Sequence, residues 1–559
     1  MDYLSQLPQE IIELIAHKLS QHDLFVFCTV CRAIQNKTFP LLYQHVTLTD
    51  SQYMERLATT LAKLTNDTMK PLGYFTRSLT FKCGALDVSL LDAIALACPF
   101  VTTLRFPGMC LELTVSNQSA RTSSDYPTQL PRPYTNFASN IQYTGNEDYR
   151  SCLFLGFKSF YDCIVSNHPH LTSLSFTHVG NFDDDEFRMY MRKLPAGLVE
   201  LSMNMHDRSL TIDDVEIIHK RCPLLESLDL GDSLRLAEVN EPPIVAMNYV
   251  LKEFSIRSES RNANCWSWLW YASKKYGHQL QTFRLNNAYN IYMQHDIPTT
   301  EQGRSVHNAS LDFAKQHATT LRKLELNGLG IYGGFWGFMR GAKRRGGGMS
   351  SLTRVEFKGV WFSTVFESIL GSYVYELMVF AIQSTIRELS LSLAHKNVKV
   401  QDLCRALGGC PHLTNLGIEE SSDTCMTFPL PFLLDQCSRL KQLTLKVSNV
   451  DTSLDWPTHH PITSFTLEQA TVTGEQLTQA LAAMHFLKKL NLLNIVIDEH
   501  HRPPDHKYQK PQAAIWAIPN PNMSITINGL SYSGLLGDKN YRLILGSSPT
   551  EQVSFWSFP

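Results

Sequence analysis

The sequence has little net charge and no long apolar segment that is free of charged residues. Its 559 residues include 50 lysines and arginines against 52 aspartates and glutamates, a formal net charge of −2. This balance gives no general attraction to nucleic acid or to an anionic membrane surface. The most apolar long window, residues 364–382, contains Glu367 and Glu376, and a charge near the centre of a bilayer is costly. We therefore expect no nucleic-acid partner and no membrane partner.

A secretory signal and a disulfide framework are also missing. The first ten residues, MDYLSQLPQE, lack a basic stretch followed by an apolar one. The 13 cysteines are odd in number and scattered, which is typical of reduced thiols. We therefore expect a cytoplasmic and/or nuclear protein.

Motifs that carry chemistry are scarce. There is no Gly-x-Ser-x-Gly elbow and no Gly-Lys-Ser/Thr phosphate loop. Cys28 and Cys31 have redox or zinc spacing, but no second pair stands at metal-site distance. The segment GLGIYG at 328–333 fits Gly-x-Gly-x-x-Gly, yet the strand before it alternates charge with leucine, unlike a buried dinucleotide-fold strand. We expect no enzymatic activity, no cofactor and no metal, and an enzyme hidden in this region remains a rival hypothesis.

One phrase of the form Leu-x-x-Leu-x-Leu recurs thirteen times between Val101 and Leu492. Its first apolar residues stand at 101, 171, 198, 225, 251, 280, 321, 352, 386, 413, 440, 462 and 487. In SLDL or KLEL the apolar residues alternate with polar ones, which indicates a short strand with one wet face. Stretches between the phrases, such as 211–222 and 400–410, have apolar residues at helical spacing. Because one strand and helix cannot bury its apolar face alone, stacking is predicted.

This pattern resembles the leucine-rich repeat family, in the longer form with a cysteine ending each helix. The resemblance implies an α/β solenoid, with a curved parallel sheet and outer helices. The family's Asn or Cys eight residues after the first Leu is mostly replaced here. The replacing residues are Ser233, Ala288, Ala394, Ser421, Ser448 and Ala470. An irregular solenoid is therefore expected. The aromatic clusters at 265–271 and 330–338 fit an inter-repeat core or a partner anchor.

The N-terminal stretch LPQEIIELIAHKLSQHDLFVFCTVCR, residues 7–32, predicts two short helices with apolar faces. Pro8 suits a first helical position, and Ser20 with Asp23 matches a helix-start signal. A third apolar cluster follows at 39–48. About forty residues hold more apolar surface than a module of that size can bury, and such a surplus usually marks an interface.

This arrangement resembles the F-box, an all-α module. The match consists of Leu7-Pro8-x-Glu10-Ile11, Asp23-Leu24, Val30-Cys31-Arg32, Leu41-Leu42-Tyr43 and Val46. The tryptophan commonly found two residues after the Arg is Ile34 here. Together with the repeats, the chain is similar to the F-box/leucine-rich repeat proteins, which are substrate-recognition subunits of SCF-type ubiquitin ligases. The rival hypotheses are a helical cap on the repeats and a repeat scaffold unrelated to ubiquitination.

The resemblance implies specific partners and positions. The F-box would dock a Skp-type adaptor, and through it a cullin-RING ligase, while the repeats would hold an unknown target protein. The adaptor-facing or module-core positions carried over are Leu7, Pro8, Ile11, Ile15, Leu19, Leu24, Val30 and Cys31. Target recognition would fall on exposed strand positions, namely Asp229, Arg257, Arg284, Glu325 and Glu356.

Domain boundaries follow from these patterns. We expect an F-box at 1–48, a linker helix and the first repeats at 49–106, and a polar loop or disordered insertion at 107–150. Leucine-rich repeats are expected at 151–497, a Pro-rich linker at 498–524 and a C-terminal cap at 525–559.

Overall fold

The structure of the chain is a computed structural model that divides into two compact units. The first comprises Met1–Val239 and Val250–Ser260, and the second comprises Asn240–Tyr249 and Arg261–Pro559. The structure describes residues 6–49, 53–62, 71–82, 88–106, 168, 170–178, 184–236, 248, 250–258, 265–287, 301–327, 351–358, 378–393, 399–420, 427–451, 456–457, 459–472, 474–497, 514–517, 524–527, 530–532, 541–545 and 554–557.

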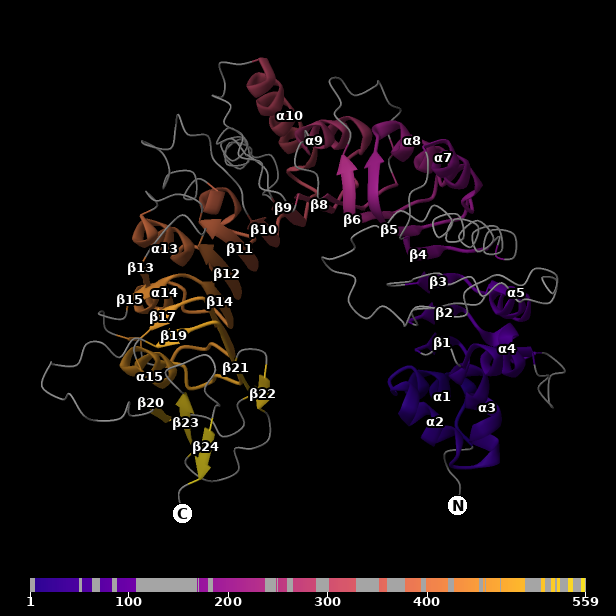
Figure 1. The fold of residues 1–559 in the computed structure, drawn as a ribbon, viewed down its shortest axis with the longest axis horizontal. Helices are drawn as coiled ribbons and strands as arrows, with labels where there is room; N and C mark the ends of the chain where they lie inside the picture. The colour runs from indigo at the N-terminus through magenta and orange to yellow at the C-terminus, as the bar shows by residue number, and fades with distance from the viewer. Residues whose placement is uncertain are drawn as a thin grey trace, which may run out of the picture. The chain divides into compact units, whose positions relative to one another are not determined.

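The first unit begins with a helical module of α1 (Gln9–Ala16), α2 (Gln21–Cys28) and α3 (Arg32–Leu42). Helices α1 and α2 both pack on α3 (Figure 1). The Ser20 hydroxyl accepts a hydrogen bond from the Asp23 amide at the start of α2, and the Cys31 sulfur accepts one from the Ile34 amide at the start of α3. These side chains satisfy amide groups that have no partner inside a helix.

The rest of the first unit repeats a strand and a helix. The strands are β1 (His45–Leu48), β2 (Ser78–Phe81), β3 (Thr103–Phe106), β4 (Ser173–His178), β5 (Glu200–Leu210), β6 (Ser227–Leu236) and β7 (Glu253–Ser258). Each pairs in parallel with the next. The helices are α4 (Met54–Ala62), the 3-10 helix η2 (Leu72–Phe75), α5 (Val88–Ala97), α7 (Asp184–Lys193) and α8 (Ile212–Arg221). Helices α7 and α8 lie side by side on one face of the sheet (Figure 1).

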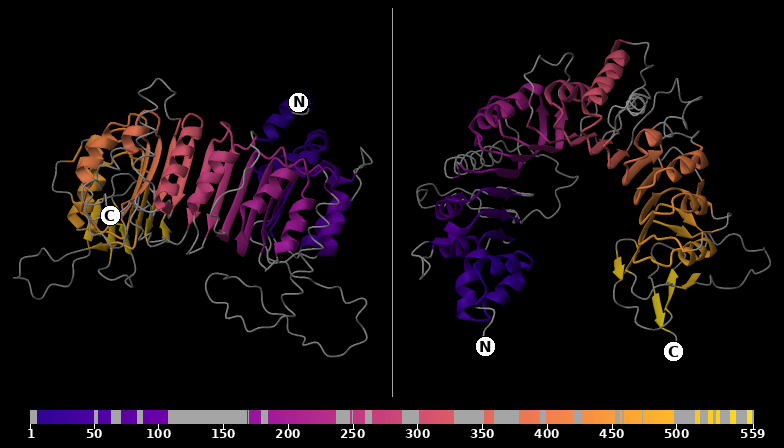
Figure 2. Two further views of the ribbon diagram at one scale, coloured as in Figure 1. Left: turned by 90° about the horizontal axis from the view of Figure 1, so that it is seen from above. Right: turned by 180° about the vertical axis from the view of Figure 1, so that it is seen from behind.

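The second unit continues the same arrangement. Its parallel strands are β8 (Thr282–Asn287), β9 (Lys323–Asn327), β10 (Arg354–Lys358), β11 (Glu388–Leu393), β12 (Asn415–Glu420), β14 (Gln442–Lys446), β16 (Ser464–Glu468), β18 (Lys489–Leu493) and β21 (Ser524–Ile527). The helices are α9 (Cys265–Lys275), α10 (Glu301–His317), α13 (Val400–Gly408), α14 (Leu430–Gln436) and α15 (Gly474–Ala483). They lie on one face of that sheet (Figure 2).

Two smaller sheets complete the second unit. Short parallel strands form a second ladder of β13 (Thr427–Pro429), β15 (Asn449–Asp451), β17 (Thr471–Val472) and β19 (Val496–Ile497). Near the C-terminus, β20 (Ala514–Ala517), β23 (Tyr541–Leu545) and β24 (Ser554–Ser557) pair antiparallel, and β22 (Leu530–Tyr532) pairs antiparallel with β21. Strand β20 falls inside the stretch that the sequence predicted as a linker.

Burial follows the alternation in the sequence. Strand β12, for example, alternates half-buried and buried residues along its whole length. Cysteines at the ends of the repeat helices are buried as well. The Cys222 thiol donates to the Pro195 carbonyl oxygen at 3.5 Å, and burial raises its pKa to about 12. The core therefore lies between each sheet and its helices. The predicted α/β solenoid of parallel strands, preceded by a small all-α module, is confirmed.

Two of the departures from the repeat pattern, Ser448 and Ala470, lie in the described part of the second unit. Ala470 is fully buried, and the Ser448 amide donates to the Glu420 carboxylate at 2.6 Å. The Thr471 amide donates to the Ser448 carbonyl oxygen at 2.8 Å. Residues 288, 394 and 421 lie outside the described residues.

Several predicted features also lie outside the described residues. These are the insertion at 107–150, residues 498–513 of the linker, the glycine-rich segment at 328–333 and the aromatic cluster at 330–338. In the other aromatic cluster, Trp268 and Tyr271 are fully buried in α9, so these two side chains belong to the core. The domain boundaries themselves stay predictions.

Candidate functional site

The structure distributes the eight predicted adaptor positions over three environments. Pro8, Ile11 and Val30 are exposed, and Leu24 is buried. The remaining four are half-buried, namely Leu7, Ile15, Leu19 and Cys31. The sequence could not distinguish module core from surface, and this placement makes Leu24 a core residue. Whether the other residues touch an adaptor stays a prediction.

Exposed apolar residues are concentrated on the first two helices and the turn that follows them. They are Ile11, Leu14, Phe25, Val26 and Val30, which are between 41% and 61% exposed. Within the described residues, 13 large hydrophobic residues are exposed, and five of them fall in this stretch of twenty residues. Such a concentration on a small module indicates a protein-interaction surface. We call these five residues the apolar patch.

The patch includes three residues that the sequence-based prediction missed, Leu14, Phe25 and Val26. A signal for them existed in the run Leu24-Phe25-Val26-Phe27. Four consecutive apolar residues on a helix cannot all face one core, because successive side chains point about 100° apart. Part of that run had to face away from the module core.

The module is held rigidly beneath the patch. Ile12 and Ile34 are fully buried, and the Thr38 hydroxyl lies 3.1 Å from the Cys28 sulfur. The Lys37 ammonium donates to the Leu7 carbonyl oxygen at 2.8 Å, which ties the entry of α1 to α3. The patch is therefore presented by a packed core, so little ordering cost remains for binding.

The predicted target positions of the first unit form an ion pair. The Arg257 guanidinium lies 3.0 Å from the Asp229 carboxylate, between neighbouring strands β7 and β6. Both side chains are part-exposed, at 43% and 27%. The pair is thus accessible to a partner but already neutralised within the chain.

The predicted target positions of the second unit belong to a larger network centred on Arg354. The Glu325 carboxylate forms ion pairs with the Arg284 guanidinium at 3.1 Å and with the Arg354 guanidinium at 3.3 Å. Arg354 also pairs with Glu356 at 3.5 Å and with Glu388 at 3.4 Å. Arg284, Glu325 and Glu356 stand in one row across β8, β9 and β10, as alternation predicted. Arg354 and Glu388 were missed, although both occupy polar positions of the same repeated phrase.

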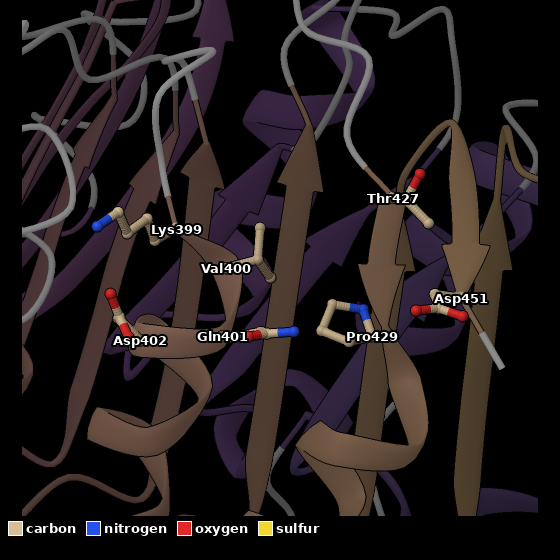
Figure 3. Close-up of a pocket in the computed structure, with 7 residues that line it drawn as sticks. All are labelled: Lys399, Val400, Gln401, Asp402, Thr427, Pro429 and Asp451. Carbon is tan, nitrogen blue, oxygen red and sulfur yellow. The ribbon is translucent and has the colours of Figure 1, made fainter. Parts of the chain in front are cut away.

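A pocket of about 370 Å³ lies at the start of α13 in the second unit. The beginning of this helix supplies one wall, and β13 and β15 supply the other (Figure 3). The lining residues are Lys399, Val400, Gln401, Asp402, Thr427, Pro429 and Asp451. Asp402 is engaged by Arg405 of the same helix, and Lys399 extends away from Thr427 and Asp451 (Figure 3). The lining contains no histidine or cysteine.

The cysteine pair of the module has structural contacts. Cys28 lies against Thr38 in the core, and Cys31 caps α3. Seven cysteines in the described part of the chain, Cys28 and Cys31 among them, have free thiols. Over the same residues, no group of three or more His, Cys, Asp or Glu side chains is placed to hold a metal ion. Nor does any helix among them have the length and hydrophobicity needed to cross a bilayer.

Comparison with known proteins assigns a domain family to the N-terminal module only. No curated protein matches the sequence. Among solved structures, the chain is similar to one chain of the crystal structure of the Rad7 and Elc1 complex in yeast, with 12% identity and a TM-score of 0.37. That alignment covers 89% of this chain and 91% of the other, and a likeness this weak carries no conclusion about partners. Residues 4–37 match the F-box domain family. The N-terminal module is therefore an F-box domain.

Proposed function

We propose that the chain is a substrate-recognition adaptor of an SCF-type ubiquitin ligase, without catalytic activity of its own. The F-box domain would dock a Skp-type adaptor, and the solenoid would hold the target protein. The observation that carries this proposal is the apolar patch on a module that matches the F-box family. Bringing the target close to a charged ubiquitin-conjugating enzyme would raise its effective concentration.

The energetics of the patch suit such docking. Fully burying one large apolar side chain contributes about 1.5–3 kcal/mol. These five residues are already about half-buried, so covering the rest of each contributes roughly half of that amount and supports docking together with polar contacts around the patch. The solvent-facing side of the strands suits a different task, because the predicted target positions there are ionic and favour selection by charge complementarity.

The test is the affinity of the full chain for a Skp-type adaptor, measured by titration calorimetry. A variant with Leu14→Glu and Val30→Glu places two carboxylates in the apolar patch. Because a buried unpaired charge is costly, we expect affinity to fall by more than about 3 kcal/mol, over a hundredfold. A control variant carries Leu96→Glu and Leu224→Glu, at residues that are 71% and 55% exposed elsewhere on the chain.

The two variants separate the hypotheses. Loss of binding in the patch variant alone supports the adaptor role. No binding of the wild-type chain, with its fold intact, would favour a repeat scaffold unrelated to ubiquitination. Equal loss in both variants would mean that the apolar patch is not the docking surface.

A further inference from the structure

The residues that precede the strands of the second unit form a continuous backbone ladder. Each amide donates to the carbonyl oxygen of the equivalent residue one strand earlier, at 2.7–2.9 Å. In strand order from β9 to β18, the ladder consists of Arg322, Thr353, Arg387, Thr414, Lys441, Thr463 and Lys488. Basic residues and threonines therefore alternate at successive strands.

The threonines stiffen this ladder. The hydroxyls of Thr353, Thr414 and Thr463 each donate, at 3.2 Å, to the carbonyl oxygen of the basic residue before them. Each basic residue thus projects from backbone that is bonded on both sides. Its position is set by the sheet, so little backbone order has to be gained when a ligand binds.

The basic residues of this edge are exposed and not engaged in ion pairs within the described part of the chain. Arg322, Arg387, Lys441 and Lys488 are all exposed, as are Lys323 and Lys489 beside the two end positions. Arg354 differs, because it is taken up by three carboxylates. We call Arg322, Lys323, Arg387, Lys441, Lys488 and Lys489 the basic edge.

The fold does not require this charge pattern. In the first unit the equivalent ladder consists of Arg77, Thr102, Thr172, Val199, Glu226 and Lys252. There Lys252 is neutralised by Glu226, whose carboxylate lies 2.6 Å away. The basic edge is therefore a property of the second unit alone, on a chain whose net charge is −2.

The edge is narrow. Carboxylates stand on the same strands, at Glu388 directly after Arg387 and a few residues further along at Glu325, Glu356, Glu419 and Glu468. A nucleic-acid duplex carries one phosphate charge for about every 1.7 Å of axis. A duplex lying along the edge would also bring phosphates over these carboxylates. A single extended polypeptide can follow the edge alone.

The spacing of the edge matches one polypeptide conformation. Adjacent strands lie about 4.8 Å apart, so basic groups at alternate strands stand about 10 Å apart, and Arg322 to Lys488 spans about 29 Å. A polyproline II helix has three residues per turn and a rise of about 3.1 Å. Residues three apart therefore lie on one side at about 9.3 Å, and four such residues span about 28 Å.

We propose that the basic edge binds an acidic polypeptide segment in the polyproline II conformation, with Asp or Glu at every third residue. As the means by which a ubiquitination target is recognised, this rests on the proposed function. The binding itself needs no adaptor and is measured without one.

The experiment titrates the full chain into fluorescein-labelled peptides and follows anisotropy. The probe repeats Glu-Pro-Pro four times, and the controls are four Gln-Pro-Pro repeats and a peptide of equal composition with its four glutamates together.

A variant with Arg387→Glu and Lys441→Glu should bind the probe at least about tenfold more weakly. The neutral variant with Arg387→Gln and Lys441→Gln, the milder change to the fold, should show a smaller loss. The matched control reverses Arg192 and Lys220, which are exposed on α7 and α8, and should bind within about twofold of wild type.

Each result has a defined meaning. The proposal predicts that the probe binds tighter than both control peptides and loses affinity in the edge variants alone. Wild-type affinity in the edge variants, or equal affinity for the clustered peptide, would overturn it. So would tighter binding of a twelve-residue oligothymidylate than of the probe, which would assign the edge to nucleic acid. Intact adaptor binding alongside such a failure would leave the proposed function standing, because the two are measured separately.

Discussion

The F-box domain and the solenoid strands expose different kinds of side chain. The domain presents five large apolar residues within twenty positions. The strands bury their apolar residues and carry ions on the other face, partly exposed in the Arg354 network and exposed in the basic edge. Burial of apolar surface gives affinity without direction, whereas ordered charges give selectivity that depends on salt. The contrast supports the proposal of one constant partner at the domain and a selected partner at the solenoid.

The interiors of the two regions also differ in their buried histidines, and lowering the pH should reveal this difference. In the solenoid, burial lowers the pKa of His168 and of His317 to about 4. The buried residues of the F-box helices include no histidine. The unfolded chain has an ordinary histidine pKa of about 6.5. Each of these groups therefore stabilises the fold fully above pH 6.5, and that stability is lost as the pH falls toward 4.

The expected loss is about 3 kcal/mol for each of the two histidines at pH 4. Urea unfolding of the full chain at pH 7.0, 5.5 and 4.0 measures it. Replacing His317 by Leu removes one titrating group and should flatten the pH dependence. An equally steep dependence in that variant would show that His317 is not held neutral in the folded chain.

A second way to sharpen the comparison is to reverse charges on the strands alone. Arg284→Glu together with Glu325→Arg keeps their mutual attraction but removes the carboxylate that faces Arg354. We expect target capture to fall about tenfold, with adaptor binding unchanged, because the exposed ions set complementarity. Capture is measured as the amount of target co-purified per adaptor molecule.

The matched control swaps Lys274 and Asp312, an ion pair of 3.1 Å on the helical face of the same unit. Like Glu325, Asp312 has a second cationic partner, here Lys315. Unchanged capture in both variants would show that the solvent-facing side of these strands is not the target site. Equal loss in both would attribute the effect to stability.

The repeated fold could be predicted from sequence because its signal is local and repeated. Alternation in phrases such as KLEL fixes which residues face the core, and the structure buries Leu324 and Leu326 as expected. The module surface could be predicted only in part, because apolar residues of core and interface look alike. Leu24 and Phe25 are neighbours in the sequence, yet one is buried and the other is 57% exposed.

The ion pairs could not be predicted, because they depend on register between strands. Arg354 lies directly beside Lys323 and Glu388, at the same level of the sheet. The alternation of basic residues and threonines along the sheet likewise appears only when residues tens of positions apart are aligned. Sequence spacing of the repeats varies too much to give that alignment.

The central claim is that the chain meets its adaptor through the apolar patch and its target through the solenoid. Hydrogen–deuterium exchange of the full chain, with and without a Skp-type adaptor, tests it most directly. We predict added protection in α1, α2 and the turn through Val30, and none in β9 to β18. Protection on those strands, or no change in the first thirty residues at saturating adaptor, would contradict it.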